Sequence, residues 1–287
     1  MRIYREETMI CNTAAIRWVI GCALWGMVGL AHARGDGLLN DLPRDGSWTL
    51  YDVRSRGDQR VKFDIPEGVA VKGADEGPKK LDHHSTLKIS SVGSASVDGR
   101  RCRWIEIESK SKAEGVHPRI LLKALIPEED LKGGKDPFAH VVWLYFQYGD
   151  DEPQLVADPK RKTYELDRFR YLLLPPVADV KRLPERSIAT ELGNLNCNVL
   201  RFHHKWKGTL SQDGSGTMAW DYGYLMFTTP KVPFGVAVLE LEGISEESNT
   251  LDADGKAISF KLESKNSFRL EVSRTGTDAV TGMPGVE

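Results

Sequence analysis

Short apolar-rich runs, separated by turn residues, dominate the chain and restrict its fold more than any other feature. Ten such runs occur: 47–54, 59–65, 85–97, 101–109, 117–126, 195–206, 217–229, 234–243, 257–262 and 266–273. Runs of this length between turn residues are typical of β-strands. Because most of them follow one another directly, we expect antiparallel pairing between sequence neighbours.

One of the turns predicts a specific hairpin. Asp98 and Gly99 separate the runs 85–97 and 101–109. An Asp-Gly pair favours a two-residue hairpin loop, because both central positions of that loop adopt positive φ.

The buried face of several runs changes partway along the strand. In 101–109, Cys102 and Trp104 lie on one face, whereas Ile105 and Ile107 lie on the other. The same change occurs in three further runs: 47–54, 195–206 and 234–242. A flat sheet covered on one side would keep one phase. The switches therefore predict long, curved strands covered on different faces at their two ends, or β-bulges.

Three segments carry helical features. Residues 127–134 predict a single turn that a glycine ends. Residues 136–149 begin with an aspartate and a proline, which favours a helix start, although this segment also suits a strand. Residues 161–175 place apolar side chains at helical spacing. We therefore expect a mainly β (α+β) fold, in which one or two helices pack on a curved antiparallel sheet or half-barrel.

The first 33 residues predict a signal peptide. An uncharged run of 16 residues, Trp18 to Ala33, ends in Ala31-His32-Ala33, which is a small-x-small cleavage site. The run is short for a membrane span. We expect cleavage after Ala33 and export to the periplasm or the extracellular space.

Three alternatives for the leader stay open. Met9 is a second candidate start, and Val19-Ile20-Gly21-Cys22 resembles a lipobox, in which Cys22 would carry a lipid. The apolar run continues beyond Cys22, which disfavours lipidation. The polar break after Leu30 disfavours the third alternative, an uncleaved membrane anchor.

The exported chain is expected to form one antiparallel β-rich domain over 34–273, followed by a flexible tail over 274–287. Cleavage changes the formal net charge from -2 to about -3, because the leader holds three basic and two acidic residues. This near balance provides no basic surface for nucleic acid or an anionic membrane. No other long uncharged apolar run occurs, so we expect no transmembrane segment after cleavage.

The exported chain holds two cysteines, Cys102 and Cys197, and three interpretations of them are open. In an oxidising compartment they would form a disulfide that closes a loop of 96 residues. Such a loop stabilises a fold by about 4–5 kcal/mol in the chain-entropy model. Two buried free thiols and a catalytic thiol with a histidine partner are the alternatives. We favour the disulfide.

Four stretches resemble a family of exported bacterial proteins of unknown function: LPRDGSWTLYDV, LKISSVGSASVDGRRCRWIEIE, ALIPEEDLKGGKDPFAHVV and VPFGVAVLELE. The resemblance spans roughly residues 40–275. That family is in turn similar to the lipoprotein carriers of the LolA/LolB type. The resemblance implies an open antiparallel half-barrel wrapped over a helix, with an apolar cavity. It carries over no site residue to this chain.

We expect no cofactor, no metal site and no catalysis. His83-His84 and His203-His204 are adjacent in strands and therefore point to opposite faces. Residues 252–255 begin like a calcium loop but lack its ligand spacing. No Ser-His-Asp signature occurs. Glu106 and Glu108 share one face at a spacing that a glycosidase dyad could use, but the alternation favours a solvated face.

The aromatic residues generate the functional hypothesis. Residues at alternate positions from Met218 to Met226 form one unbroken large apolar face, which is either core or the lining of a cavity. Tyr and Trp would suit a hydrophobic or amphiphilic ligand, such as a lipid or a lipoprotein acyl chain. The candidate lining residues are Trp48, Trp104, Phe202, Trp220, Tyr222 and Tyr224. The alternative is an envelope interaction or structural protein with a protein partner and no small ligand.

Overall fold

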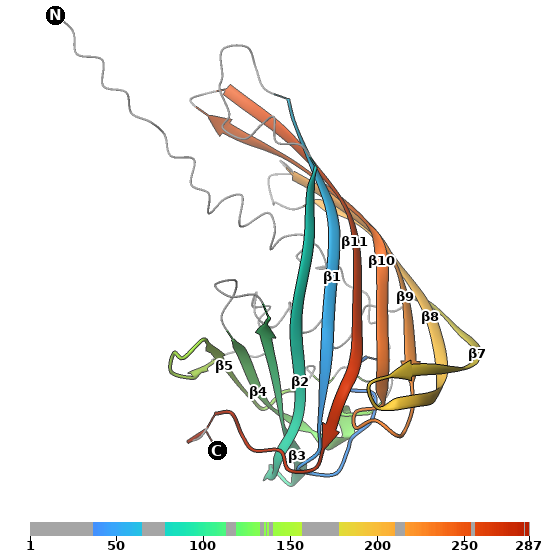
Figure 1. Cartoon of the computed structure of the whole chain (residues 1–287). Helices are drawn as coiled ribbons and strands as arrows, with labels where there is room; N and C mark the ends of the chain where they lie inside the picture. Colours follow the sequence, from blue (N-terminus) through green and yellow to red (C-terminus); the bar gives the residue numbers. More distant parts are fainter. Residues whose placement is uncertain are drawn as a thin grey trace, which may run out of the picture.

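A computed structural model describes residues 37–64, 78–112, 119–132, 135, 137, 140–156, 178–209, 216–253, 256–283 and 285–286. These residues form one antiparallel sheet of eleven strands (Figure 1). The strands are β1 (Trp48–Asp64), β2 (Lys79–Val97), β3 (Arg100–Ser111), β4 (Ile120–Pro127), β5 (Trp143–Tyr148), β6 (Gln154–Leu155), β7 (Ala178–Thr190), β8 (Gly193–Thr209), β9 (Gly216–Thr228), β10 (Val236–Ala253) and β11 (Lys256–Gly276). Their order is β6-β5-β4-β3-β2-β1-β11-β10-β9-β8-β7, so the sheet is open. The prediction of a mainly β, antiparallel, curved sheet is confirmed.

Predicted runs merge into long curved strands. Runs 47–54 and 59–65 both belong to the 17-residue β1, and the same merging produces the 21-residue β11. The polar residues 55–58 look like a turn in the sequence, but they continue the ladder between β1 and β11. Burial alternates along β1. We call the face that carries Tyr51 and Val53 the inner face of the sheet, and the opposite face the outer face.

The change of buried face marks places where both faces of the sheet are covered. On β3, Ile105 and Ile107 belong to the main core, whereas Cys102 and Trp104 belong to a separate cluster on the opposite face. On β8, burial switches after Val199, and β7 contacts β11 although three strands lie between them in the sheet. The β7–β8 hairpin therefore folds back over the sheet, as its lower end shows in Figure 1.

The Asp-Gly hairpin is confirmed, and one strand was missed. Asp98 and Gly99 join β2 to β3 with φ values of 51° and 73°. Strand β7 was not predicted, because its charged stretch, with Pro184 inside it, lacks an apolar alternation. Charged residues and proline are usual on an edge strand, which pairs on one side only.

The three segments with predicted helical features have different outcomes in the structure. Within 127–134 the structure has a 3₁₀ turn, Glu128–Asp130. The helix over 136–149 is wrong, because Trp143–Tyr148 is β5 and pairs with β4. The segment 161–175 and the leader 1–33 lie outside the described residues. The described part of the chain contains no α-helix, and therefore no helix there is long and apolar enough to span a membrane.

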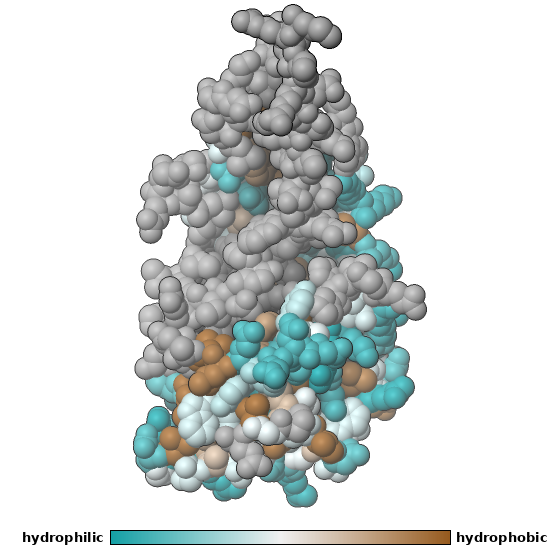
Figure 2. Space-filling model, turned by 90° about the vertical axis from the view of Figure 1, so that its left-hand side faces the viewer, coloured by the Kyte–Doolittle hydropathy of each residue, from teal (hydrophilic) through white to brown (hydrophobic). Residues whose placement is uncertain are grey.

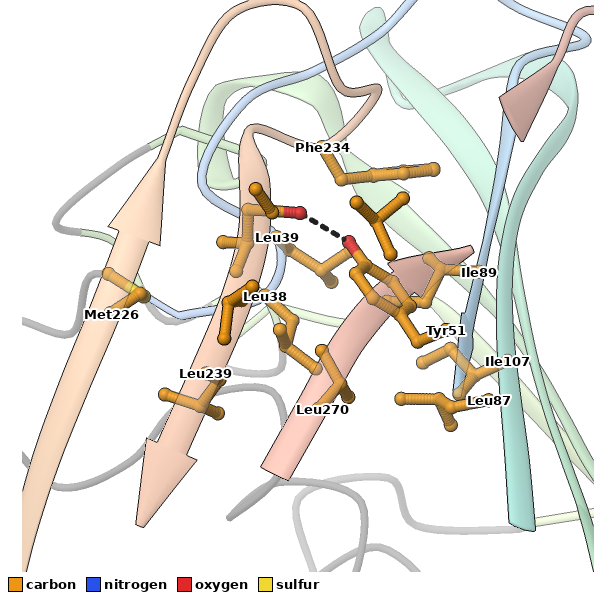
Figure 3. Packing of buried hydrophobic residues seen from close by; sticks show 14 of the residues in the cluster. Leu38, Leu39, Tyr51, Leu87, Ile89, Ile107, Met226, Phe234, Leu239 and Leu270 are labelled. Atoms are coloured by element: carbon orange, nitrogen blue, oxygen red, sulfur yellow. Dashed lines mark hydrogen bonds between the residues drawn. The ribbon is translucent and has the colours of Figure 1, made fainter. Parts of the chain in front are cut away.

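The protein's own side chains close the lower end of the inner face. Leu38 and Leu39, which precede β1, are at most 3% exposed and pack among strand residues beside Phe234 (Figure 3). The Tyr51 hydroxyl donates a hydrogen bond to Val236 O at 3.1 Å. Burial raises the pKa of Tyr51. This end of the inner face is a core rather than a cavity.

The outer face of β3 and β4 is covered by residues that we expected to form a flexible tail. Strand β11 continues to Gly276, and the Glu106 carboxylate accepts hydrogen bonds from Thr281 Oγ1 and, at 2.8 Å, from Gly282 N. Lys123 Nζ donates to Val286 O at 2.6 Å. Glu106 and Lys123 are each 4% exposed. Buried charges require such partners, so these tail residues are bound. The expected solvated face at Glu106 is wrong for the same reason.

The predicted disulfide is also wrong. Cys102 and Cys197 are both buried free thiols. They lie on β3 and β8, with five strands between them in the sheet. Cys102 packs with Trp104 and Leu125, whereas Cys197 belongs to the main core. A disulfide requires Cα atoms within about 7 Å, which two separate clusters do not offer.

We expect the chain without residues 1–33 to hold two thiols that react only after unfolding. Burial shields both sulfur atoms and raises both thiol pKa values, so little thiolate forms in the native protein. Thiol titration with and without urea, at about pH 8, measures this. Prior reduction should leave the count unchanged. A peptide linking Cys102 to Cys197 in a non-reducing digest would contradict the structure.

Candidate functional site

The candidate site lies on the upper part of the inner face, beyond the closed core. We call a row of inner-face residues that lie opposite one another on neighbouring strands a step. The site begins with an aromatic step, whose members are Ser55, Phe268, Leu241, Tyr224 and Phe202. The rings of Phe202 and Tyr224 stack with centroids 4.8 Å apart. Stacked aromatic pairs contribute about 0.5–1.5 kcal/mol beyond their burial and hold a rigid surface.

The next step combines glycines with an aromatic and a histidine. Its cross-strand neighbours are Gly57, Asn266, Gly243, Tyr222 and His204. A Cβ on Gly243 would lie 2.3 Å from Tyr222 Cδ1, so only glycine lets that ring lie against β10. The His204 ring lies 5.9 Å from the Trp220 ring. Burial lowers the pKa of His204, and the charge of His203 lowers it further.

Polar and apolar side chains are both buried at the third step. Gln59, Ser264, Ser245 and Trp220 are cross-strand neighbours. Gln59, Ser264 and Trp220 are each at most 5% exposed. The sheet therefore carries a polar strip across a face that is otherwise aromatic and aliphatic.

The site ends at the upper end of the sheet, beyond Gln59. Leu262 and Met218 flank Glu247 on neighbouring strands, and burial raises the pKa of Glu247. Beyond them Phe63 and Phe260 pair, with ring centroids 6.3 Å apart. A cleft of about 320 Å³ opens at this end of the sheet, where most of its lining residues have the register of the outer face. It is lined by Lys62, Phe63, Asp64, Thr217, Ser248, Asn249, Thr250, Ser259, Phe260 and Lys261.

The structure brings together four of the six predicted lining residues. Phe202, Trp220, Tyr222 and Tyr224 lie on β8 and β9 and are all at most 4% exposed. The predicted alternation from Met218 to Met226 is confirmed, because all five alternate residues are buried. Their burial fits either a core or a ligand-binding face.

Trp48 and Trp104 lie elsewhere. Trp48 Nε1 donates a hydrogen bond to Asp278 at 2.8 Å, and Lys88 Nζ lies 5.0 Å from the Trp48 ring. Trp104 belongs to the smaller cluster and stacks on Trp143 with centroids 6.1 Å apart. Both occupy even-numbered positions of strands whose odd-numbered residues form the core. The sequence shows the phase change but does not show which face is inner.

Sequence reasoning missed the polar members of the site. Gln59, Ser264 and Asn266 fall between predicted runs or at their ends, where polar residues suggest turns. One pattern in the sequence could have revealed them. Gln59, Val61 and Phe63 occupy odd-numbered positions, like Tyr51 and Val53, so one strand with one buried face can run through the polar stretch between them.

The two histidines of each pair lie on opposite faces of the sheet, as their adjacency predicts. His204 is buried on the inner face, and His203 on the outer face contacts Asp221, whose carboxylate lies 3.1 Å from Lys205 Nζ. Hydrogen bonds from Lys205 and from His203 lower the pKa of Asp221. His83 and His84 likewise differ in exposure. Among the described residues no group of three or more His, Cys, Asp or Glu side chains could hold a metal ion.

The chain matches no protein-family model and no curated protein. Among solved structures it is similar to a "putative lipoprotein" of Parabacteroides distasonis, with TM-score 0.34 and 8% identity, over 84% of this chain and 99% of that one. A DUF1329 family protein of Desulfovibrio piger has TM-score 0.28 and 8% identity, over 82% and 88%. MucB in complex with MucA(peri) has TM-score 0.15 and 8% identity, over 76% and 88%. At TM-scores this low, the likenesses carry no argument, and the resemblance to an exported family stays a prediction.

The buried His204 and the partly buried Glu247 should affect stability in opposite directions as pH changes. The native state holds His204 with a lowered pKa, so it binds fewer protons than the unfolded state below about pH 6.5. The His204 contribution is therefore lost as pH falls from about 7 to 5, by at most about 1.4 kcal/mol per pH unit. Glu247 has a raised pKa, so its contribution is lost as pH rises above about 4.3.

Urea unfolding at several pH values tests this prediction with two variants. The unfolding free energy should rise less steeply with pH between about pH 5 and 7 in His204→Gln than in the native chain. In Glu247→Gln it should rise more steeply over the same range. Parallel curves for the native chain and both variants would show that neither group is shifted by burial.

Proposed function

We propose that the chain is an exported, non-catalytic protein that binds a hydrophobic or amphiphilic ligand on the upper inner face. A lipid or a lipoprotein acyl chain is the class of ligand that suits it. The observation that carries this proposal is the mixed character of that face, where Gln59 and Ser264 are buried in the same cross-strand row as Trp220. A ligand-binding surface is largely apolar with a few placed polar groups, and the upper inner face has this composition.

The two parts of the inner face differ in a way that supports the proposal. The lower part is filled by aliphatic residues such as Leu38, Leu39 and Leu270, with the Tyr51 hydroxyl bonded to Val236 O. The upper part holds three polar atoms without hydrogen-bond partners among the described residues: Gln59 Nε2, Ser264 Oγ and Asn266 Nδ2. A face used only as core gains stability from apolar residues, whereas polar residues there favour recognition.

The groups that could perform catalysis suit other roles. Burial raises the thiol pKa values of Cys102 and Cys197, which disfavours a nucleophilic thiolate. The His203–Asp221 pair lies on the outer face beside Lys205, in a charged cross-strand cluster. Such clusters are usual on a solvated sheet face.

A second candidate function, an envelope interaction protein, rests on a different surface. The edge strands β5 and β6 carry exposed large hydrophobic residues: Trp143 is 41% exposed, Tyr148 46% and Leu155 57%. Figure 2 shows hydrophobic patches, in brown, over the lower part of the face that it presents. An open edge with exposed apolar residues can pair with a strand of a partner.

We expect native mass spectrometry of the chain without residues 1–33, purified without detergent, to detect a bound lipid-sized ligand or the uptake of an added lipid. Trp220→Ala should weaken lipid binding about tenfold, because it removes a large apolar contact from the inner face. Trp143→Ala, on the exposed edge, serves as the matched control and should bind normally. Equal loss in both variants, or a chain that takes up no lipid, would favour the interaction protein.

A further inference from the structure

Three polar side-chain atoms on the inner face lack hydrogen-bond partners among the described residues. The atoms are Gln59 Nε2 on β1 and Ser264 Oγ and Asn266 Nδ2 on β11. Gln59 is 5% exposed and Ser264 is 4% exposed. Burying a polar atom without a partner is unfavourable, and such atoms are rare in folded proteins. We call these three residues the polar belt.

The polar belt is compact enough for one chemical group to contact more than one member. Gln59 lies directly opposite Ser264, and Asn266 lies opposite Gly57 on the same face. Directly opposite residues have Cβ atoms about 5 Å apart, and diagonal neighbours lie about 7–8 Å apart. A Cβ on Gly57 would lie 2.7 Å from Asn266 Oδ1, so glycine at this position makes room for the Asn266 amide.

The unpartnered atoms define the ligand group by their hydrogen-bond chemistry. The Gln59 and Asn266 nitrogen atoms are donors, and the Ser264 hydroxyl donates or accepts. A ligand group that satisfies all three must offer acceptor oxygen atoms, as a carbonyl group does.

The surroundings of the polar belt favour an uncharged group. His204 lies in the same step as Asn266 but three strands away, and its lowered pKa favours its neutral form. Glu247, on the other side, would repel an anion. Lys79 is opposite Gln59 on β2 but is exposed at that end of the sheet. A buried ionised headgroup would need a buried charged partner, which the described residues of the belt do not include.

Apolar residues lie on both sides of the belt. Phe268 lies one step toward the core, two residues beyond Asn266 on β11, and Val61 and Leu262 lie one step toward Phe63. Phe63 continues the inner face of β1 and lies four residues from Gln59, which is about 13 Å along an extended strand. An acyl chain on this face would therefore place a polar group partway along an apolar surface.

We propose that the polar belt binds the carbonyl oxygen atoms of an uncharged acyl ester or acyl amide, while the flanking aromatic and aliphatic residues bind its hydrocarbon chain. This inference rests on the proposed ligand-binding function and specifies the class of ligand.

Two uncharged probes that differ only in the carbonyl group test the inference. Glyceryl monopalmitate carries an ester carbonyl, whereas hexadecyl glyceryl ether has the same chain length without it. The chain without residues 1–33 should bind the ester about tenfold more tightly than the ether, because one or two hydrogen bonds are at stake. In Gln59→Leu and Asn266→Leu the preference should fall toward onefold, while the affinity for the ether is retained.

The stability of the empty protein gives an independent readout. Ser264→Ala removes an unpartnered hydroxyl, so it should leave the urea midpoint unchanged or raise it. Ser273→Ala is the matched control on the same strand. Its hydroxyl is also buried but donates to Leu50 O at 3.2 Å, so its loss should lower the midpoint.

The outcomes separate this inference from the proposed function. Equal binding of ester and ether, or tighter binding of free palmitate than of the ester, would overturn the acyl-carbonyl inference and leave lipid binding in place. Binding of none of the three probes would overturn both. A Ser264→Ala variant destabilised as much as Ser273→Ala would show that the Ser264 hydroxyl is bonded in the empty protein, and the polar belt would be wrong.

Discussion

The ladder between β1 and β11 is the interaction on which the rest of the structure depends. It joins two meanders, β1–β6 and β7–β11, each of which pairs sequence neighbours. Its register runs from Trp48 opposite Gly276 to Asp64 opposite Ser259. A Cβ on Gly276 would lie 2.5 Å from the Trp48 ring, so the ladder needs glycine there. Because the partners lie about two hundred residues apart, loop closure makes this pairing the slow, non-local step of folding.

The same ladder carries the polar belt at its middle, which links the fold to the proposed function. At its lower end, closed by Leu38 and Leu39, the inner face stabilises the sheet. Toward the cleft, Gln59 and Ser264 are polar where aliphatic residues would stabilise the protein more. A sheet of this length can hold a less stable surface over part of its inner face, because the closed end and the outer-face contacts of Glu106 and Lys123 stabilise the remainder.

Features that depend on local chemistry were predictable from the sequence. The Asp98-Gly99 hairpin and the alternation on β9 require only backbone preference and a period of two. Features that depend on distant segments were not. The sequence does not show that the tail covers Trp48 and Glu106, or that Cys197 belongs to a different cluster from Cys102. The polar belt was missed because polar residues inside a strand have the composition of a turn.

Photo-crosslinking tests most directly whether the inner face is a ligand-binding surface. A fatty-acyl glyceride with a diazirine on its hydrocarbon chain would be bound, irradiated and mapped by peptide mass spectrometry. We expect labels on β8 and β9, at the aromatic step of Phe202 and Tyr224 and toward Met218. Labels confined to the exposed edge at Trp143 and Leu155, or none that excess unlabelled glyceride displaces, would contradict it.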